Sequence, residues 1–380
     1  MATVGVDIRV LGTGPHSGIQ EYTERLLEHM VPAADVSWKL FYAGRRPLEY
    51  RSWMSRENVS VHELTRSNRL LWARTRLTGR PWLDELVGGA DAFFFPHFLL
   101  GATSSRCARV MAWHDLSYEL MPDLLTPGRR FWHRFVMRPH RQAQSADRII
   151  AVSESTRDDL MTLYGIAPER IATVHSGIDP MIRRASDGEL ALFRAREGLP
   201  PRFIMSLSTR EPRKNLEGLV RAFERMAGGR RYTDVSLVLA GPDGWLEGPL
   251  RRHINRSPLR TRIRLIGSLR REERALWLSA ASVFAYPSLM EGFGFPPLEA
   301  MACGTPVLAA ANSSMFETAG DAALLVDPYG VDRMASSLAA LMDDEALRGR
   351  LIGSGFERAR SFTWEHAARG TLDVIRSVLQ

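Results

Sequence analysis

The stretch EGFGFPPLEAMACGTPV, residues 291–307, carries a turn signal followed at once by a helix signal. Pro296 and Pro297 suit the first turn of a helix, where a missing N–H costs nothing. The helix is expected to run to Cys303, with Gly304 as its C-terminal stop. A glycine turn that leads from a strand into a helix in this way is typical of an open α/β sheet.

The start of this helix is expected to bind an anion. The amides of Gly292, Phe293 and Gly294 can point at a phosphate, and the helix dipole favours negative charge at that end. Glu291 and Glu299 would repel a diphosphate, so we expect them to accept hydrogen bonds from sugar hydroxyls on either side of it. The stretch therefore predicts a nucleotide-sugar site.

The longer stretch PSLMEGFGFPPLEAMACGTPV, residues 287–307, resembles the family 4 glycosyltransferases, in which two glutamates stand eight positions apart in such a frame. For either carboxylate alone, a structural explanation is favoured, in which Glu299 complements the helix dipole and the glycines form an ordinary strand-to-helix turn. The whole frame favours the resemblance, which implies retaining transfer of a hexose from an α-linked nucleotide sugar. It also implies a GT-B fold, two Rossmann-like domains facing a central cleft, with the last helix crossing back to the N-terminal domain.

Lysine is rare in this chain, which has only Lys39 and Lys214. Lys214 lies in FIMSLSTREPRKN, residues 203–215, where a strand leads into a basic loop. Loops after parallel strands face the ligand crevice, so Lys214 can reach a phosphate while Arg210 clamps its oxygens. The resemblance implies the same role for both, on the diphosphate of the donor. A solvated basic loop is the alternative.

His114 follows an apolar strand directly in RVMAWHDLSYELMPD, residues 109–123. It is expected at the ligand edge of its sheet. The HDLSYE context resembles the family motif whose histidine contacts the donor sugar beside the anomeric centre. We expect a hydrogen-bonding role in the transition state, not the role of general base.

Two further segments are expected to contact the donor. In DIRVLGTGPHSGIQEYTERLL, residues 7–27, Gly14 and Gly18 allow close approach of the backbone to a ligand, although a flexible turn would look the same. In the segment that begins GSLRREE at residue 267, the resemblance implies backbone contacts from Ser268 and Leu269 to the base. The motifs look most like those of bacterial mannosyltransferases, so GDP-mannose is the first choice of donor and a UDP-sugar the second.

The chain organisation agrees with two domains. Short apolar strands alternate with helical stretches, which indicates parallel sheets built of βαβ units. At 380 residues the chain exceeds a usual single core. We expect an N-terminal acceptor-side domain, a linker, a nucleotide-sugar-binding domain and a returning C-terminal helix, at residues 1–182, 183–201, 202–361 and 362–380. A helix is also expected over residues 127–146, and the first strand is expected near residues 4–11.

Composition and short motifs limit the cellular compartment, the metal requirement and the kind of partner that we expect. The N-terminus shows neither a signal peptide nor a membrane span, and Cys107 and Cys303 lack metal-ligand spacing, so a reducing cytoplasm is expected. No D-x-D motif is present, so we expect no metal and no cofactor, with leaving-group stabilisation from side chains and amides. The formal charge of +7 indicates an anionic partner.

The sequence says least about the acceptor. We expect a glycan or a lipid-linked acceptor of cell-surface polysaccharide biosynthesis. Residues 65–86 mix arginines with apolar side chains, namely Arg66, Arg69, Arg74, Arg76, Arg80, Leu70, Leu71, Trp72 and Trp82. That pattern fits peripheral contact with the inner face of a membrane, but an ordinary domain helix with a wet basic face fits it as well. A nucleotide-sugar epimerase and a non-catalytic sugar- or nucleic-acid-binding protein are the alternative functions, although no nucleic-acid partner is expected.

Overall fold

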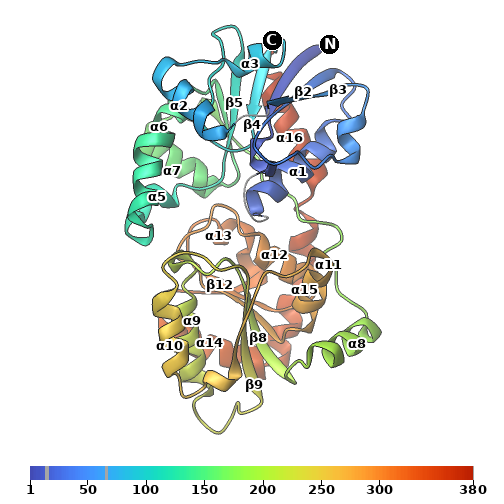
Figure 1. Ribbon diagram of the computed structural model, residues 1–380. Coiled ribbons are helices and arrows are strands. Elements are labelled where there is room, and N and C mark those ends of the chain that lie inside the picture. The colour runs from blue at the N-terminus through green and yellow to red at the C-terminus, as the bar shows by residue number, and fades with distance from the viewer. Residues whose placement is uncertain (13–16, 65–66, 380) are drawn as a thin grey trace. The chain divides into compact units, whose positions relative to one another are not determined.

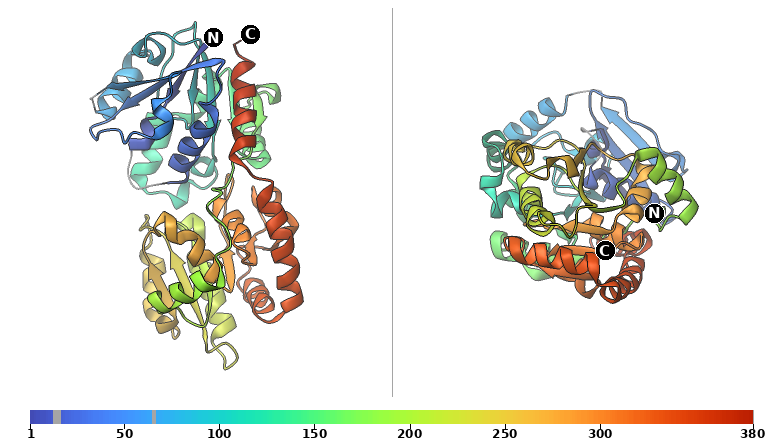
Figure 2. Two further views of the ribbon diagram at one scale, coloured as in Figure 1. Left: turned by 90° about the vertical axis from the view of Figure 1, so that its right-hand side faces the viewer. Right: turned by 90° about the horizontal axis from the view of Figure 1, so that it is seen from below.

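A computed structural model describes residues 1–12, 17–64 and 67–379 (Figures 1 and 2). The chain divides into two compact units. Unit 1 comprises residues 1–118, 127–177 and 363–380, and unit 2 comprises residues 119–126 and 178–362. Each unit is built around its own parallel sheet.

Unit 1 contains a parallel sheet with the strand order β3-β2-β1-β4-β5-β6-β7. The strands are β1 (Ala2–Asp7), β2 (Val36–Ala43), β3 (Val59–Leu64), β4 (Ala92–Phe95), β5 (Ala108–Trp113), β6 (Arg148–Ala151) and β7 (Ile171–Thr173). Its helices include α1 (Gly18–Met30), α2 (Asn68–Thr78), α3 (Leu83–Leu86), α4 (Ser117–Leu120), α5 (Pro127–Phe131), α6 (Pro139–Ser145), α7 (Glu154–Tyr164) and α16 (Trp364–Arg376). The central strand β4 is fully buried, and its neighbours β1 and β5 are buried after their first two residues, as expected for a sheet covered on both faces.

The C-terminal helix α16 belongs to unit 1 and packs against α1. Tyr22 of α1 meets Trp364 edge to face, with ring centroids 6.0 Å apart. Arg376 also forms an ion pair with Asp35 at 2.9 Å. The predicted return of the last helix to the N-terminal domain is therefore confirmed.

Unit 2 contains a second parallel sheet, with the order β10-β9-β8-β11-β12-β13. Its strands are β8 (Arg202–Leu207), β9 (Val235–Ala240), β10 (Ile263–Ile266), β11 (Val283–Tyr286), β12 (Val307–Ala310) and β13 (Ala323–Val326). Its helices include α8 (Asp187–Glu197), α9 (Leu216–Ala227), α10 (Gly248–Arg256), α11 (Arg271–Ala280), α12 (Phe295–Ala302), α13 (Met315–Thr318), α14 (Val331–Asp343) and α15 (Glu345–Arg360). The strand order reverses between β8 and β11, and such a switch point opens a ligand crevice at the carboxyl ends of the strands.

Two local predictions are wrong. The helix predicted over residues 127–146 is broken into α5, a π-helical segment η4 (Trp132–Met137) and α6. The break falls at Arg138, which has a left-handed φ of 47° and precedes Pro139, because a residue before proline is forced out of the helical region. The first strand ends at Asp7 instead of Leu11, since the Asp7 carboxylate accepts a hydrogen bond from the Arg9 amide and turns the chain into a 3-10 helix.

Candidate functional site

The candidate site lies on the loops that follow β8 and β11, the two neighbouring strands at the switch point of unit 2. These strands pair in parallel, with Ile204 opposite Val283. Their carboxyl ends therefore meet at one edge of the sheet. A short 3-10 helix, η6 (Pro212–Lys214), follows β8, and the glycine turn before α12 follows β11.

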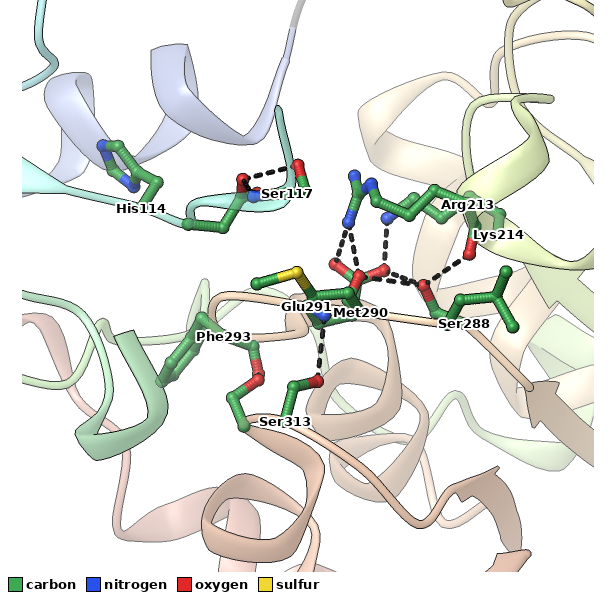
Figure 3. Close-up of polar contacts among 12 residues, drawn as sticks. His114, Ser117, Arg213, Lys214, Ser288, Met290, Glu291, Phe293 and Ser313 are labelled. Atoms are coloured by element: carbon green, nitrogen blue, oxygen red, sulfur yellow. Dashed lines mark hydrogen bonds and ion pairs between the residues drawn. The ribbon is translucent and has the colours of Figure 1, made fainter. Parts of the chain in front are cut away.

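A buried cluster of charges joins the two loops (Figure 3). The Lys214 ammonium donates to Glu291 Oε1 at 2.5 Å and to the Tyr286 hydroxyl at 3.0 Å. Arg213 Nη1 lies 3.2 Å from Glu291 Oε2, and the Ser288 hydroxyl donates to Glu291 Oε1 at 2.5 Å. Arg213 also donates to the carbonyl of Met290 at 2.6 Å, so the cation holds both the carboxylate and the loop that carries it.

Burial and pairing set the charge states of this cluster. Burial by itself raises the pKa of Glu291, but the Lys214 ammonium, the Arg213 guanidinium and hydrogen bonds from Lys214 and Ser288 lower it to about 2. Burial lowers the pKa of Lys214, helped by Arg213 and opposed by Glu291. Glu291 is thus a carboxylate at neutral pH, held there by cations that water does not screen.

Two serines that follow β12 hold the glycine turn before α12 in place. Ser313 Oγ accepts from the Glu291 amide at 3.0 Å, and Ser314 Oγ donates to the Phe293 carbonyl at 3.2 Å. Gly294 has a left-handed φ of 89°, and a Cβ there would lie 2.2 Å from the Met315 methyl carbon. Glycine is therefore required at this position by the backbone, whereas the Met315 methyl is the end of a flexible side chain that can move.

The predicted helix at residues 295–303 is confirmed as α12, and Gly304 ends it with a φ of 73°. No side chain caps its start, and no acidic residue lies in its first turn. Among the described residues, the amides of Gly292 and Gly294 donate no backbone hydrogen bond. Two amides and a helix start are thereby left for a ligand.

Glu299 lies in the body of α12, with 2% of its surface exposed. Its Oε1 accepts a hydrogen bond from Arg274 Nη1 of α11 at 2.6 Å. The two glutamates of the motif are therefore held by different cations, Glu291 by the loop after β8 and Glu299 by the neighbouring helix.

Arg210 makes a different set of contacts from Lys214. Its guanidinium pairs with Asp243 and with Glu247, the latter at 3.1 Å, and it donates to the carbonyls of Gly241 and Ile266. Gly241, Asp243 and Glu247 lie between β9 and α10, and Ile266 is the last residue of β10. In the described residues it is Arg213, not Arg210, that shares a carboxylate with Lys214.

The predicted base-contacting residues lie on the loop after β10, where Ser268 is exposed and Leu269 is half-buried. The preceding carbonyl, that of Gly267, accepts from the Gly241 amide at 3.0 Å. Because Arg210 also binds Gly241 and Ile266, it ties this loop to the one after β9.

In unit 1, His114 follows β5 as predicted and is half-buried. Its Nε2 lies 2.8 Å from the Pro96 carbonyl, and its ring meets Tyr22 edge to face at 4.7 Å. Burial lowers the pKa of His114, although the Pro96 carbonyl and Asp115 act in the opposite direction. His97, at the end of the neighbouring strand β4, lies with its ring centroid 5.8 Å from that of His114.

The predicted glycine loop of unit 1 lies only partly within the described residues. Gly14 lies outside the described residues. Gly18 is the first residue of α1, and Ser17 and Gln20 close a capping box over this helix start. Two amides at this helix start, those of Ser17 and Gln20, are therefore satisfied by the chain itself.

Sequence reasoning did not assign a role to Tyr286, Ser288 or Arg274. Ser288 could have been found, because it stands three positions before Glu291 within the same motif. Arg274 could not, since its contact with Glu299 joins two helices whose packing no local pattern specifies.

Residues 1–12, 17–64 and 67–379 contain neither a metal-binding group of side chains nor a membrane-spanning helix. Within these ranges no three His, Cys, Asp or Glu side chains are grouped so as to hold a metal ion. No helix in the same ranges is both long enough and apolar enough to span a bilayer.

Comparison with known proteins decides the family. Residues 191–358 match the family model described as glycosyl transferases group 1, and residues 16–181 match the model described as Glycosyltransferase Family 4. The chain belongs to these glycosyltransferases. It is therefore a glycosyltransferase enzyme, as the motif at residues 287–307 indicates.

Relatives and solved structures agree with this family. The chain is 28% identical to the O-antigen chain mannosyltransferase B of Escherichia coli, over 95% of this chain and 96% of that protein. It is 33% identical to a D-inositol 3-phosphate glycosyltransferase of Nocardioides, over 61% of this chain and 54% of that protein. The crystal structure of Anabaena Alr3699/HepE in complex with UDP-glucose has a TM-score of 0.75 at 17% identity, covering 99% of this chain and all of that one. The fold is GT-B, as predicted.

Proposed function

We propose that this glycosyltransferase moves a hexose, with mannose as first choice, from a nucleotide diphosphate sugar to a glycan or lipid-linked acceptor, with retention of configuration. The observation that carries the proposal is the buried ammonium of Lys214, paired at a switch point with Glu291 of the glycine turn, in which the amides of Gly292 and Gly294 donate no backbone hydrogen bond. A diphosphate is the ligand that a buried cation, two amides and a helix start recognise together.

The chemistry proposed for unit 2 is leaving-group stabilisation. As the bond between the anomeric carbon and the diphosphate oxygen breaks, negative charge grows on that oxygen. Lys214, Arg213 and the two glycine amides are placed in advance to stabilise it, which costs no reorganisation during the reaction. The acceptor hydroxyl attacks from the same face, and its proton passes to the departing diphosphate oxygen.

Other residues are proposed to orient the donor. Glu291, which already accepts hydrogen bonds from Lys214 and Ser288, would also accept one from a hydroxyl of the transferred sugar. Glu299 would accept a hydrogen bond from a ribose hydroxyl of the donor. His114 would serve the sugar as a neutral hydrogen-bonding group, since its lowered pKa keeps it uncharged at pH 7. Arg210 would act through the loops after β9 and β10, where Ser268 and Leu269 are proposed to meet the base.

The choice of mannose rests on relatives. Besides mannosyltransferase B, the chain is 27% identical over 66% of its length to the serotype-specific mannosyltransferase WbdA of Escherichia coli. The D-inositol 3-phosphate glycosyltransferases and the UDP-glucose complex favour other sugars and acceptors. GDP-mannose is therefore the first donor to test and UDP-glucose the second. A cytoplasmic location, with peripheral contact at the membrane, completes the proposal.

A panel of donors tests it. GDP-mannose, UDP-glucose and UDP-N-acetylglucosamine are each incubated with the protein, and thermal shift and release of free nucleotide are measured. We expect one donor to raise the melting temperature in a concentration-dependent way and to release nucleotide when acceptor is supplied. Stabilisation by none of them would contradict the proposal, and an epimerised donor in the absence of acceptor would favour the epimerase alternative.

A further inference from the structure

Helix α2 of unit 1 exposes apolar side chains that pack against nothing. Leu70 is 68% exposed and Leu77 is 84% exposed, whereas Leu71 is buried in the core. Seven residues apart, Leu70 and Leu77 lie on one flank of the helix, with Arg74 between them. Thus α2 has one side that faces the core and another on which leucines and arginine alternate.

The segment α5–η4 continues this surface beside α2 (Figure 1). Trp72 of α2 and Trp132 of η4 meet edge to face, with ring centroids 5.1 Å apart. Phe131 is 60% exposed and Phe135 is 50% exposed, and their rings lie 5.0 Å apart. Four large apolar side chains are therefore presented to solvent by two helical segments in contact.

The charge around these side chains has a single sign. Residues 67–82 and 127–146 contain no Asp or Glu. Besides Arg80, which lies over the Trp82 ring, six of their arginines form no ion pair with any residue that the structure describes: Arg69, Arg74, Arg76, Arg134, Arg138 and Arg141. Desolvation, and then Arg76 and Arg141, lower the pKa of Arg138, which shows that cations from α2 and from the η4–α6 turn lie close together.

Neither property is explained by packing within unit 1. Like charges held close together repel one another, and exposed leucines and phenylalanines gain nothing from water. An anionic lipid surface relieves both costs, because its headgroups neutralise arginines while its acyl boundary accepts apolar side chains. A nucleic acid would neutralise the charge and could stack on Phe131 and Phe135, but it offers nothing to Leu70 and Leu77.

We propose that the α2–η4 surface, meaning these six arginines with Leu70, Leu77, Phe131 and Phe135, docks this enzyme on a membrane rich in anionic lipid. The proposal deepens the proposed function, because a docked enzyme meets a lipid-linked acceptor at the surface that carries it. Docking itself needs neither donor nor acceptor, so it is measured separately from transfer.

Vesicle co-sedimentation tests the docking. The intact protein is mixed with phosphatidylcholine vesicles, with or without phosphatidylglycerol, at several salt concentrations. We expect binding only when phosphatidylglycerol is present, and weaker binding as salt rises. Replacing Arg69, Arg74 and Arg76 together by Gln should weaken binding about 100-fold, since each juxtamembrane basic residue contributes about fivefold.

Matched variants separate this surface from general charge. Replacing Arg252, Arg256 and Arg260 of unit 2 by Gln removes the same charge from another exposed region and should leave binding within about twofold. Leu70→Ser with Leu77→Ser should also weaken binding, while Leu192→Ser, at a position 77% exposed on α8, should not. Thermal unfolding checks that each variant folds.

The outcomes are distinguishable. Equal losses in the two arginine variants, or equal binding to both kinds of vesicle, would overturn the proposal. Binding of single-stranded oligonucleotide that is lost in the Arg69, Arg74 and Arg76 variant, without vesicle binding, would assign the surface to nucleic acid and also overturn it. Vesicle binding by a protein that releases nucleotide from no donor would leave the docking standing and refute the proposed function alone.

Discussion

The two sheets of this enzyme lead, at their carboxyl edges, to titratable groups of opposite character. In unit 1 the strands β4 and β5 lead to His97 and His114, whose pKa values are lowered by burial. In unit 2 the strands β8 and β11 lead to Lys214 and Glu291, which form a buried ion pair at 2.5 Å. The position at the carboxyl edge is the same, but one edge is neutral and the other is charged.

The difference lies in how desolvation is offset. A buried imidazole without a carboxylate against it escapes the cost of burial by staying neutral. Glu291 cannot do so, because two cations and a hydroxyl hold it ionised, and each member of that cluster depends on the others. The charged edge is thus suited to stabilising an anionic leaving group and the neutral edge to hydrogen bonding.

The largest effect is expected from breaking the charged edge. Lys214→Ala should lower turnover by 10²- to 10³-fold, because it removes a preorganised charge worth roughly 3 kcal/mol in the transition state. Arg213 still pairs with Glu291 in this variant, so the carboxylate is not left alone. The measurement is the rate of nucleotide release at saturating donor.

Lys39 offers a matched control, since it is the other lysine of the chain and its ammonium binds the carbonyls of Gly88 and Gly89 in unit 1. Lys39→Ala should keep turnover within about twofold. Equal losses in the two variants would show that charge at the carboxyl edge of unit 2 has no special role.

A smaller effect should divide the two glutamates. Glu291→Gln should lower kcat by about tenfold, because the sugar contact acts on the chemical step, whereas Glu299→Gln should mainly raise KM by a similar factor. Arg274→Gln should resemble Glu299→Gln, since Arg274 holds that carboxylate. Steady-state kinetics with varied donor measure both parameters, and the division fails if each glutamate variant changes them alike.

The smallest effect concerns the neutral edge and pH. Burial keeps the pKa values of His97, His114 and His133 below the ordinary value in the folded protein. The unfolded chain therefore binds more protons below about pH 6.5, and stability should fall as pH decreases through that region. The Glu291 ion pair adds a loss only lower, from its unfolded pKa near 4.5 toward about 2.

Thermal unfolding between pH 7.5 and pH 5 measures this. His97→Phe keeps an apolar ring in the buried site and should flatten the decrease in melting temperature. His366→Phe, at an exposed position on α16, should leave the decrease unchanged. An unaltered slope in His97→Phe would contradict the account of the neutral edge.

Much of unit 2 could be predicted from sequence because its signals are local. Proline at the first helical turn and Gly304 at the end predicted α12 almost to the residue. That the loop of Lys214 and the glycine turn both face the ligand crevice followed from one rule, that loops after parallel strands lie at one edge of the sheet. The ion pair between Lys214 and Glu291 was not predicted.

The arginine that shares Glu291 with Lys214 could not be predicted in the same way. Arg210 and Lys214 stand four apart, which suggests a shared face only if the backbone is helical. Instead the backbone of Arg210 forms an isolated β-bridge with that of Asp243. Between Arg210 and Lys214 only η6 is helical. The choice between Arg210 and Arg213 depends on where that turn begins, which tertiary contacts decide.

Strand β3 was not predicted for a related reason. Its sequence VSVHEL shows weak alternation of apolar and polar residues, and its side chains are at most half-buried at the edge of the sheet. Pairing with β2 fixes this segment as a strand more than its own composition does.

The most direct test of the central claim joins charge and stereochemistry in one reaction. Transfer from an α-linked donor is run in excess EDTA, and the anomeric coupling of the product is read by NMR. If Lys214, Arg213 and the glycine amides stabilise the departing diphosphate, transfer should persist and the product should keep the α configuration. Loss of transfer with rescue by magnesium or manganese, or a β-linked product, would contradict the account.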